Sequence, residues 1–323
     1  MTESDEAADV RDAQAGDHAA FERAIGPYRQ ELHRHCYRMT GSVDDADDIL
    51  QETLFRAWRS LGTYAGRSPF RAWLYRIATN RSIDSLGAKH RQEIAVSWDG
   101  QDEGLEPMWL QPYHPETDPA AMTEQREDLA IAFVVAIQRL PPKQRAALLL
   151  RDILGFSIPD AAHALDTTEA ATNSALQRAR ANMPAHLPDR PATDREIALR
   201  DRLIDAWHRA DIAQLTDLMA TDITLTMPPD RVRIESPIAV TDFMAATAPN
   251  GRLDQMRLLP TTTNRQPAVA IYTLAESGDY ERLVLMTLDI AEDKISHLTA
   301  YTIPPSHFDR FNLPETYPQA AST

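Results

Sequence analysis

FSIPDAAHALDTTEAATNSALQRARANM, residues 156–183, predicts two short helices joined by a tight polar turn. Ser157 suits the N-cap of the first helix, and Pro159 falls in its opening turn, where a missing N–H costs nothing. The first helix runs to Leu165, and residues 166–168 form the turn. This pattern is typical of a helix-turn-helix that reads DNA. Taken alone, it is equally typical of two helices packed inside a bundle.

The second helix of the pair is basic near its end. Its spacing turns Ala171, Ala175 and Leu176 toward the first helix. The polar residues that remain available to phosphates and base edges are Thr172, Asn173, Gln177, Arg178 and Arg180.

Composition indicates an ordinary soluble protein of 323 residues, enough for two or three domains. No apolar run approaches the roughly 18 to 20 residues that span a bilayer, and the acidic start does not resemble a signal peptide. We therefore expect a cytoplasmic protein without membrane contact. The single cysteine, Cys36, excludes an internal disulfide and a multi-cysteine zinc site, and we expect neither metal nor cofactor.

The net charge of −15 is unusual for a protein that binds nucleic acid, because DNA affinity depends on neutralising phosphates. The charges are segregated, however. Residues 64–91 contain six Lys or Arg and one acid, Asp84, whereas residues 92–128 contain ten acids and one Arg. Residues 44–56 contain five acids and one Arg. A basic segment thus lies between two acidic ones, of which the second is typical of a solvated linker.

The periodicity of the chain predicts four segments. Residues 12–90 are expected to form an all-helical bundle and residues 123–184 a second helical domain with the helix-turn-helix. Residues 91–122 form an acidic linker, and residues 195–316 are expected to form an α+β domain. The predicted fold class is therefore multidomain, with two all-α domains followed by an α+β domain.

The α+β segment begins with a helix and continues with short strands separated by turns. The expected helix covers residues 196–220, and the expected strands are residues 223–227, 269–275, 283–291 and 295–301.

The acidic linker contains an apolar motif, MWLQPY, at residues 108–113. Flexible linkers rarely contain Trp and Tyr, so we expect this motif to dock on another part of the chain, through Trp109, Leu110 and Tyr113.

The segment SVDDADDILQETLFRAWRSL, residues 42–61, predicts an amphipathic helix. Ala46, Ile49, Leu50, Thr53, Ala57 and Leu61 form its apolar stripe. The opposite side is acidic and also carries an aromatic residue; its members include Asp48, Gln51, Glu52 and Phe55. Such a side is either a solvated surface or a surface for a protein partner.

The next segment, TYAGRSPFRAWLYRIATNRSIDSL, alternates aromatic rings with cations after a loop that contains glycine. Unpaired bases stack on rings at about 1–3 kcal/mol each, while Arg follows the backbone, so the pattern suits single-stranded DNA. The candidate residues are Gly66, Arg67, Ser68, Phe70, Arg71, Trp73, Arg76, Asn80 and Arg81. Alternatively, Trp73 packs in the core of the bundle.

Three motifs in one order resemble regions two and four of an extracytoplasmic-function sigma factor of bacterial RNA polymerase. They are DADDILQETLFRAW, FRAWLYRIATNRSIDSL and LPPKQRAALLLRDILGFS with LQRAR, and the resemblance covers about residues 19–183. It implies that Asp48, Gln51 and Glu52 contact the clamp helices of the largest polymerase subunit, and that the flap is a further contact. Phe70, Trp73, Asn80 and the loop at residues 66–68 would receive the opened minus-ten strand. The polar residues of the second helix of the pair would meet the minus-thirty-five duplex.

The end of the chain resembles the sigma factors that carry a fused SnoaL-like domain with a cone fold, because of WLQPY and LVLMTLDIAEDKISHLTAYTIPPSHFDRFNLP. Catalysis in this fold needs an acid or base inside the cone, and the candidates are Asp205, Tyr272, Asp289 and His297. Their spacing does not compel an acid–base pair. We therefore expect a regulatory domain that holds an unknown small ligand, in preference to an enzyme.

Three functions remain open from the residues alone. A sigma factor accounts for the acidic helix, the aromatic-basic helix and the helix-turn-helix together. A helix-turn-helix regulator with a ligand-sensing domain leaves the acidic helix unexplained. A SnoaL-like enzyme requires an acid–base pair in the cone.

Overall fold

The computed structural model describes residues 3–96, 111–113, 131–183, 192–227, 230–264, 266–275 and 277–318. The chain divides into two compact units. The helical unit consists of Met1–Pro107 with Val134–Leu187, and the α+β unit consists of Met108–Phe133 with Pro188–Thr323. The two predicted helical segments therefore pack as one unit.

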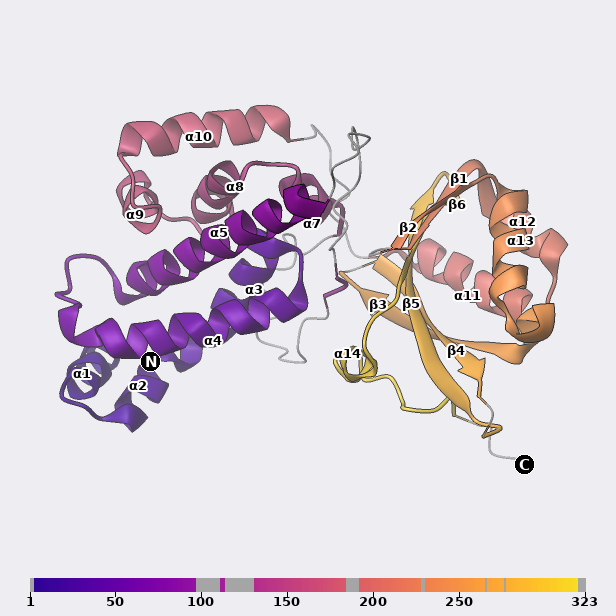
Figure 1. Ribbon diagram of the computed structural model, residues 1–323, viewed down its shortest axis with the longest axis horizontal. Helices are drawn as coiled ribbons and strands as arrows, with labels where there is room; N and C mark the ends of the chain where they lie inside the picture. The colour runs from indigo at the N-terminus through magenta and orange to yellow at the C-terminus, as the bar shows by residue number, and fades with distance from the viewer. Residues whose placement is uncertain are drawn as a thin grey trace. The chain divides into compact units, whose positions relative to one another are not determined.

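The first part of the helical unit contains α1 (Glu3–Gln14), α2 (His18–Ile25), α3 (Arg29–Thr40), α4 (Val43–Ser60) and α5 (Phe70–Val96) (Figure 1). The bundle thus begins earlier than the predicted boundary at residue 12. Gly41 ends α3 in the left-handed conformation, with φ of 74°, and the Ser42 hydroxyl accepts a hydrogen bond from the Asp45 N–H at 3.1 Å. These two caps separate α3 from α4 sharply.

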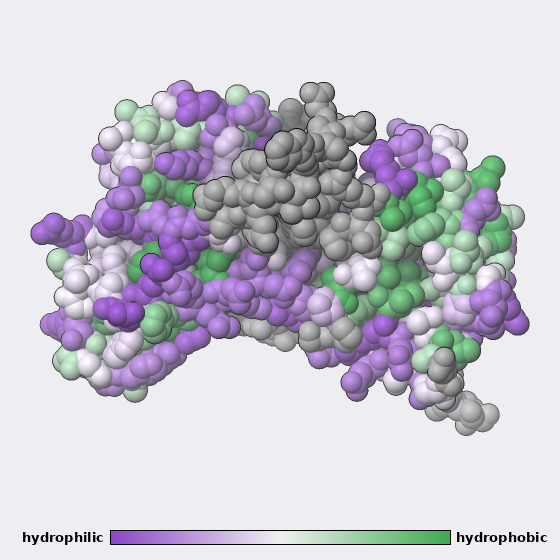
Figure 2. Space-filling view, in the orientation of Figure 1, coloured by the Kyte–Doolittle hydropathy of each residue, from purple (hydrophilic) through white to green (hydrophobic). Residues whose placement is uncertain are grey.

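Helix α4 packs on α3 and α5 through the predicted stripe. Ala46, Ile49, Thr53, Ala57 and Leu61 are buried, which confirms the amphipathic pattern, while Leu50 is half-buried. Hydrophilic side chains cover most of α4 on the face shown in Figure 2.

The second part of the helical unit contains α7 (Ile131–Gln138), α8 (Pro142–Leu148), a π-helical turn (Leu149–Ile153), α9 (Ile158–Ala164) and α10 (Glu169–Asn182). The predicted cap forms, since the Ser157 hydroxyl accepts a hydrogen bond from a backbone N–H in the first turn of α9. Thr168, predicted as part of the turn, caps α10 in the same way. Asp166, in the turn, has φ of 51°. Helix α5 packs against both α8 and α9, so this part lies on the first part of the unit.

The α+β unit contains α11 (Asp194–His208), α12 (Ile212–Leu218), β1 (Met219–Met227), β2 (Asp230–Glu235), α13 (Pro237–Thr247), β3 (Met256–Thr263), β4 (Gln266–Leu274), β5 (Tyr280–Ala291), β6 (Lys294–Tyr301) and α14 (Pro305–Asp309) (Figure 1). The sheet has the order β2-β1-β6-β5-β4-β3, and β1 pairs with β6 in parallel while the other pairs are antiparallel. Three helices, α11 to α13, share an apolar core with one face of this sheet. This arrangement is the α+β domain that the sequence predicted for residues 195–316.

The two strands that the sequence did not predict, β2 and β3, are the edges of the sheet. Strand β2 alternates charged and apolar residues over only six positions, and β3 contains Pro260. Edge strands are short or interrupted in this way because they need no second hydrogen-bonded neighbour, which weakens their sequence signal.

Candidate nucleic-acid interface

The acidic face of α4 is open to solvent. Asp48 and Gln51 are exposed, and the Phe55 side chain is 55% exposed. The Arg59 guanidinium lies 5.5 Å from the centre of the Phe55 ring, and the half-buried Glu52 accepts a hydrogen bond from Arg56. An exposed aromatic ring between acidic residues is suited to a protein partner, because rings contribute much of the energy of such interfaces.

Four aromatic side chains gather where α5 begins. The Trp73 ring stacks on Phe70, with centroids 5.6 Å apart and planes at 24°, and Tyr64 lies 5.2 Å from Trp73. Tyr28 closes the cluster against Phe70 at 6.2 Å. Trp73 and Tyr64 are half-buried, so each presents part of a ring to solvent.

Phe70 corrects one sequence prediction, which placed it on the DNA-contacting side. Only 3% of the residue is exposed, because Tyr28 from η1 (Gly26–Tyr28) and Tyr64 both pack on it. In this arrangement Phe70 is therefore covered and supports the Trp73 ring. Tyr64 is the ring that the sequence analysis missed; its signal was an aromatic residue in the loop that also contains Gly66.

The loop between α4 and α5 keeps its glycine for a conformational reason. Gly66 has φ of 68°, a region that residues with a Cβ rarely adopt. The Tyr64 hydroxyl donates a hydrogen bond to the Ser68 carbonyl at 2.7 Å, across this turn. Arg67 is exposed and Ser68 is half-buried, so the loop presents a cation and its backbone beside the aromatic cluster.

An open hollow of about 880 Å³ lies between α4 and α5. Its lining includes Phe55 from α4 and Trp73, Arg76, Asn80 and Arg81 from α5. Two of these cations have acidic partners: Arg76 pairs with Asp166 at 3.2 Å, and Arg81 pairs with Asp84. One hollow thus joins predicted polymerase-binding and minus-ten residues with the turn between α9 and α10.

Arg71 is the second residue whose predicted role needs correction. Its guanidinium pairs with Glu31 at 2.9 and 3.2 Å and donates to the Leu154 carbonyl at 3.3 Å. It also lies 4.7 Å from the centre of the Phe156 ring. Arg71 therefore joins the two parts of the helical unit, and in this arrangement it is not available to DNA.

Helix α10 exposes most of the residues that the sequence assigned to it. Asn173, Gln177, Arg178 and Arg180 are all exposed. Arg180 also pairs with Asp152 at 2.6 Å. Thr172 was predicted to meet DNA, but it is buried.

Thr172 and Ala171 exchange the roles predicted for them. The Thr172 hydroxyl donates to the Thr168 carbonyl at 3.1 Å, one turn earlier in the chain, and its residue is 0% exposed. Ala171, predicted to face α9, is exposed. Ala175 and Leu176 are buried as predicted, so the helix keeps its predicted face at these positions and differs from the prediction only at residues 171 and 172.

Arg145 fastens the two parts of the helical unit together and was not found from the sequence. It is buried, and its guanidinium donates to the carbonyls of Ile137, Gln138 and Leu140 near the end of α7, and to that of Met39 near the end of α3. Burial lowers the pKa of Arg145 to about 10. A cation at two helix C-termini is favourable because the carbonyl ends carry partial negative charge.

In the α+β unit, the linker motif contacts the turn between β3 and β4. The Tyr113 N–H donates to the Asn264 side-chain oxygen at 2.7 Å, and the Asn264 N–H donates back to the Tyr113 carbonyl at 3.1 Å. The Thr263 hydroxyl donates to the same carbonyl at 3.3 Å. Tyr113 is buried, whereas Trp109 and Leu110 lie outside the described residues.

None of the four acid–base candidates belongs to the apolar core that the sheet shares with α11 to α13, although Tyr272 is buried. Tyr272 donates to the Pro314 carbonyl at 2.8 Å, and a ring nitrogen of His297 lies 2.9 Å from the Thr226 hydroxyl. Asp289 accepts from Gln266, and Asp205 is exposed. The strand positions that face the helices carry aliphatic residues such as Leu288 and Leu298. The described core between the sheet and these helices is thus an apolar cluster.

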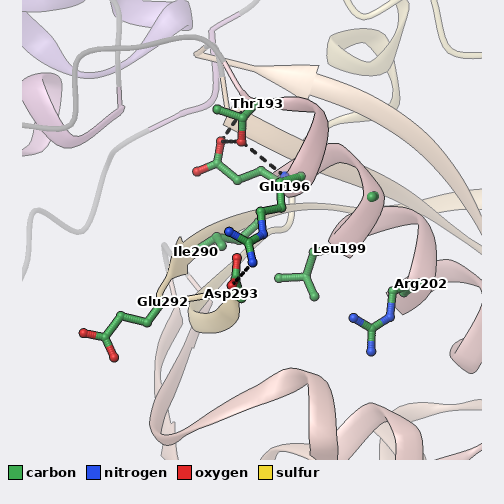
Figure 3. A pocket seen from close by; sticks show the side chains of 9 residues that line it. Thr193, Glu196, Leu199, Arg202, Ile290, Glu292 and Asp293 are labelled. Atoms are coloured by element: carbon green, nitrogen blue, oxygen red, sulfur yellow. Dashed lines mark hydrogen bonds and ion pairs between the residues drawn. The ribbon is translucent and has the colours of Figure 1, made fainter.

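A hollow of about 680 Å³ opens at the rim of the α+β unit instead. Figure 3 shows it between the first turns of α11 and the turn after β5, with Leu199 and Ile290 among its lining residues. Arg195 pairs with Asp293 at 2.6 Å there, and Thr193 and Glu196 form a capping box. Three of its charged side chains, Arg195, Asp293 and Glu196, are thus committed to a local pair and to the helix cap.

Neither a metal cluster nor a membrane span occurs in the part of the chain that the structure describes. There, no three His, Cys, Asp or Glu side chains are placed to hold a metal ion, and no helix is long and apolar enough to cross a membrane. Burial raises the pKa of the Cys36 thiol to about 12, so this cysteine is unreactive.

Sequence comparison matches both parts of the helical unit to known families. Sigma-70 region 2 matches residues 24–92, and Sigma-70, region 4 matches residues 131–183. The extracytoplasmic-function RNA polymerase sigma factor SigG of Mycobacterium tuberculosis is 37% identical over 326 residues, which cover 94% of this chain and 86% of SigG. The chain belongs to the extracytoplasmic-function sigma factors.

A second relative agrees with this assignment in both sequence and structure. SigJ of Mycobacterium tuberculosis is 34% identical over 215 residues, which cover 61% of this sigma factor and 62% of SigJ. The crystal structure of SigJ has a TM-score of 0.57 with 23% identity, and covers 88% of this chain and 95% of that one, so it shows a shared fold. As a sigma factor, the protein is a transcription initiation factor and not an enzyme, and its partners are core RNA polymerase and promoter DNA.

Proposed function

We propose that this sigma factor binds core polymerase through the exposed face of α4, and that it receives the melted minus-ten strand in the adjacent hollow. The observation that supports this most directly is the shared hollow of about 880 Å³, in which Phe55 of α4 and Trp73 and Asn80 of α5 meet. A polymerase bound to α4 would then hold the opened strand beside the rings of Trp73 and Tyr64. The protein would act in the cytoplasm, where the polymerase is.

Within the same proposal, α10 reads the minus-thirty-five duplex. Asn173, Gln177 and Arg178 are its exposed polar residues. Amide and guanidinium groups are the side chains that pair with base edges in the major groove. Arg180 is held by Asp152 and would contact a phosphate only after that pair opens.

A binding and transcription assay tests the polymerase surface. We expect Phe55→Ala to lower affinity for core polymerase by about 30-fold, a typical loss for an exposed ring at the centre of an interface. Asp48→Ala with Gln51→Ala should lower it further and abolish the promoter-dependent transcript. Asp12→Ala, which removes an exposed acid from α1, is the matched control and should bind as the wild type does. Equal binding by all these variants would refute the proposal.

We also propose that the α+β unit modulates the sigma factor in cis through the linker. The mutual hydrogen bonds of Tyr113 and Asn264 support this, because they tie the segment between the two matched sigma regions to the β3–β4 turn. Any change in that turn would alter the path available to the linker, and so the freedom of the region that contains α10.

Asn264→Gly separates this contact from folding. Asn264 has φ of 47°, which glycine adopts without strain, so the turn should persist while the side-chain acceptor for Tyr113 is lost. Transcript yield from the cognate promoter should change in the same direction as when residues 195–323 are deleted. Unchanged yield with both variants would eliminate modulation in cis.

A further inference from the structure

Gln14, the last residue of α1, contacts the start of the loop that precedes α5. Its side-chain amide donates to the Leu61 carbonyl at 3.0 Å and to the Tyr64 carbonyl at 2.8 Å. These carbonyls belong to the first turn of the loop, where the Tyr64 N–H also donates to the Leu61 carbonyl at 3.0 Å. Gln14 lies before residue 24, where the match to Sigma-70 region 2 begins.

Tyr64 connects the start of this loop to its end and to the aromatic cluster. Its hydroxyl donates to the Ser68 carbonyl at 2.7 Å, and its ring contacts Trp73 at 5.2 Å and Phe70 at 5.6 Å. A shift of the Tyr64 backbone would therefore move the loop and the ring that supports Trp73. Loop residues 66–68 are the ones expected to receive the opened strand.

Helix α1 is itself a fixed support for Gln14. Val10 and Ala13 are buried in the bundle, and Asp9 pairs with Arg23 of α2 at 2.8 Å. Glu6 accepts a hydrogen bond from the Tyr28 hydroxyl, and Tyr28 is a member of the aromatic cluster. Helix α1 thus contacts both the cluster and the loop, so that the amide of Gln14 extends from a rigid element.

We propose that Gln14 is a positioning residue for the minus-ten loop: it preorganises Tyr64 and Trp73 for the melted strand without contacting DNA. This inference rests on the proposed function of that loop. Preorganisation raises affinity because ordering of the loop is not required at the moment of binding.

The chemistry of the two acceptors defines the test. Both are carbonyl oxygens, so only a donor satisfies them. Gln14→Glu has nearly the same shape but places a carboxylate, which only accepts, against two carbonyls. Gln14→Lys restores donors at the end of a longer, flexible side chain. Arg11→Gln, an exposed change three residues earlier, is the matched control, because Arg11 bonds only within α1 through the Ala7 carbonyl among the contacts described.

The experiment measures how the full-length sigma factor, bound to core polymerase, binds a single-stranded oligonucleotide. The oligonucleotide carries the non-template minus-ten segment of a promoter that the wild type transcribes. We expect Gln14→Glu to weaken binding about fivefold, as for loss of neutral hydrogen bonds at a partly exposed site. Gln14→Lys should bind within about twofold of the wild type, and Arg11→Gln as the wild type. Affinities for core polymerase and for minus-thirty-five duplex should stay unchanged in all three variants.

Two results would overturn the inference. One is wild-type affinity of Gln14→Glu for the oligonucleotide; the other is an equal loss of oligonucleotide, duplex and core binding, which would indicate general destabilisation. Trp73→Ala separates this inference from the proposed function. If Trp73→Ala weakens binding and Gln14→Glu does not, only the role of Gln14 is wrong. If Trp73→Ala has no effect, the assignment of the hollow itself fails.

Discussion

Helices α4 and α5 are neighbours in one bundle, yet they present their functional faces differently. Asp48, Gln51 and Phe55 of α4 are exposed to solvent. On α5, Arg71 and Arg76 are instead engaged by the second part of the helical unit, through Leu154 and Asp166. The proposed polymerase surface is therefore accessible in the free chain, while part of the proposed DNA surface is covered. From these proposed assignments we expect an order of events in which polymerase binds first and the DNA-binding face opens afterwards.

The strongest test of this comparison removes the buried contacts of Arg145, which hold the second part of the helical unit on the first part. We expect Arg145→Met to lower the free energy of unfolding of the helical unit by about 3 kcal/mol, because several buried carbonyls lose their donor at once. Urea denaturation measures it as a lower midpoint with an unchanged slope. Exposed Arg139→Met, in the same segment, is the control and should have little effect. Equal stability of the two variants would mean that Arg145 does not hold the parts together.

The features that the sequence predicted are those with local signals. The starts of α4 and α9 follow from caps at Ser42 and Ser157, whose hydroxyls accept hydrogen bonds from backbone N–H groups in the first turn. A cap and a hydrophobic period act over a few residues, so they are visible before any tertiary contact forms.

The features that the sequence did not predict depend on partners distant in the chain. Phe70 is buried because Tyr28, 42 positions earlier by residue number, covers it, and no local pattern distinguishes it from the more exposed Trp73. Arg145 lies in α8, whose sequence PKQRAAL gives no local sign that this cation is buried; its acceptor, the Met39 carbonyl, comes from α3. Tertiary contacts of this kind override local periodicity.

A pH titration sharpens the comparison by probing the buried sides of the two helices. His35 of α3 lies 2.9 Å from the Thr79 hydroxyl of α5, and its ring packs edge-on against Tyr75. Burial, together with the charges of Arg38 and Arg71, lowers the pKa of His35 to about 3. The unfolded chain, with a histidine pKa near 6.5, therefore binds more protons between pH 3 and 6.5, and stability falls as the pH decreases through that window.

We expect the free energy of unfolding of the helical unit to fall by about 2 kcal/mol from pH 7 to pH 5 on account of His35. His35→Gln should remove this part of the pH dependence. The control is His33→Gln, a change of the histidine that contacts Asp47 of α4. This variant should keep the pH dependence, because His35 is still present. Denaturation midpoints at both pH values measure the difference. An unchanged acid sensitivity in His35→Gln would show that the packing against α5 does not respond to this charge.

The smallest expected effect concerns the ion pair that covers α5 directly. The side chains of Arg76 and Asp166 are 37% and 73% exposed, so their pair contributes little to stability, and Asn tolerates the positive φ of Asp166. Asp166→Asn should therefore free Arg76 without disturbing the turn. We expect the free sigma factor to bind single-stranded DNA about two- to threefold more tightly. The matched control is Glu169→Gln, which removes one negative charge from an exposed residue at the start of α10. If both variants gain the same affinity for single-stranded DNA, the cause is the reduced overall negative charge. The ion pair of Arg76 with Asp166 would then not cover α5, and this difference between α5 and α4 would be lost.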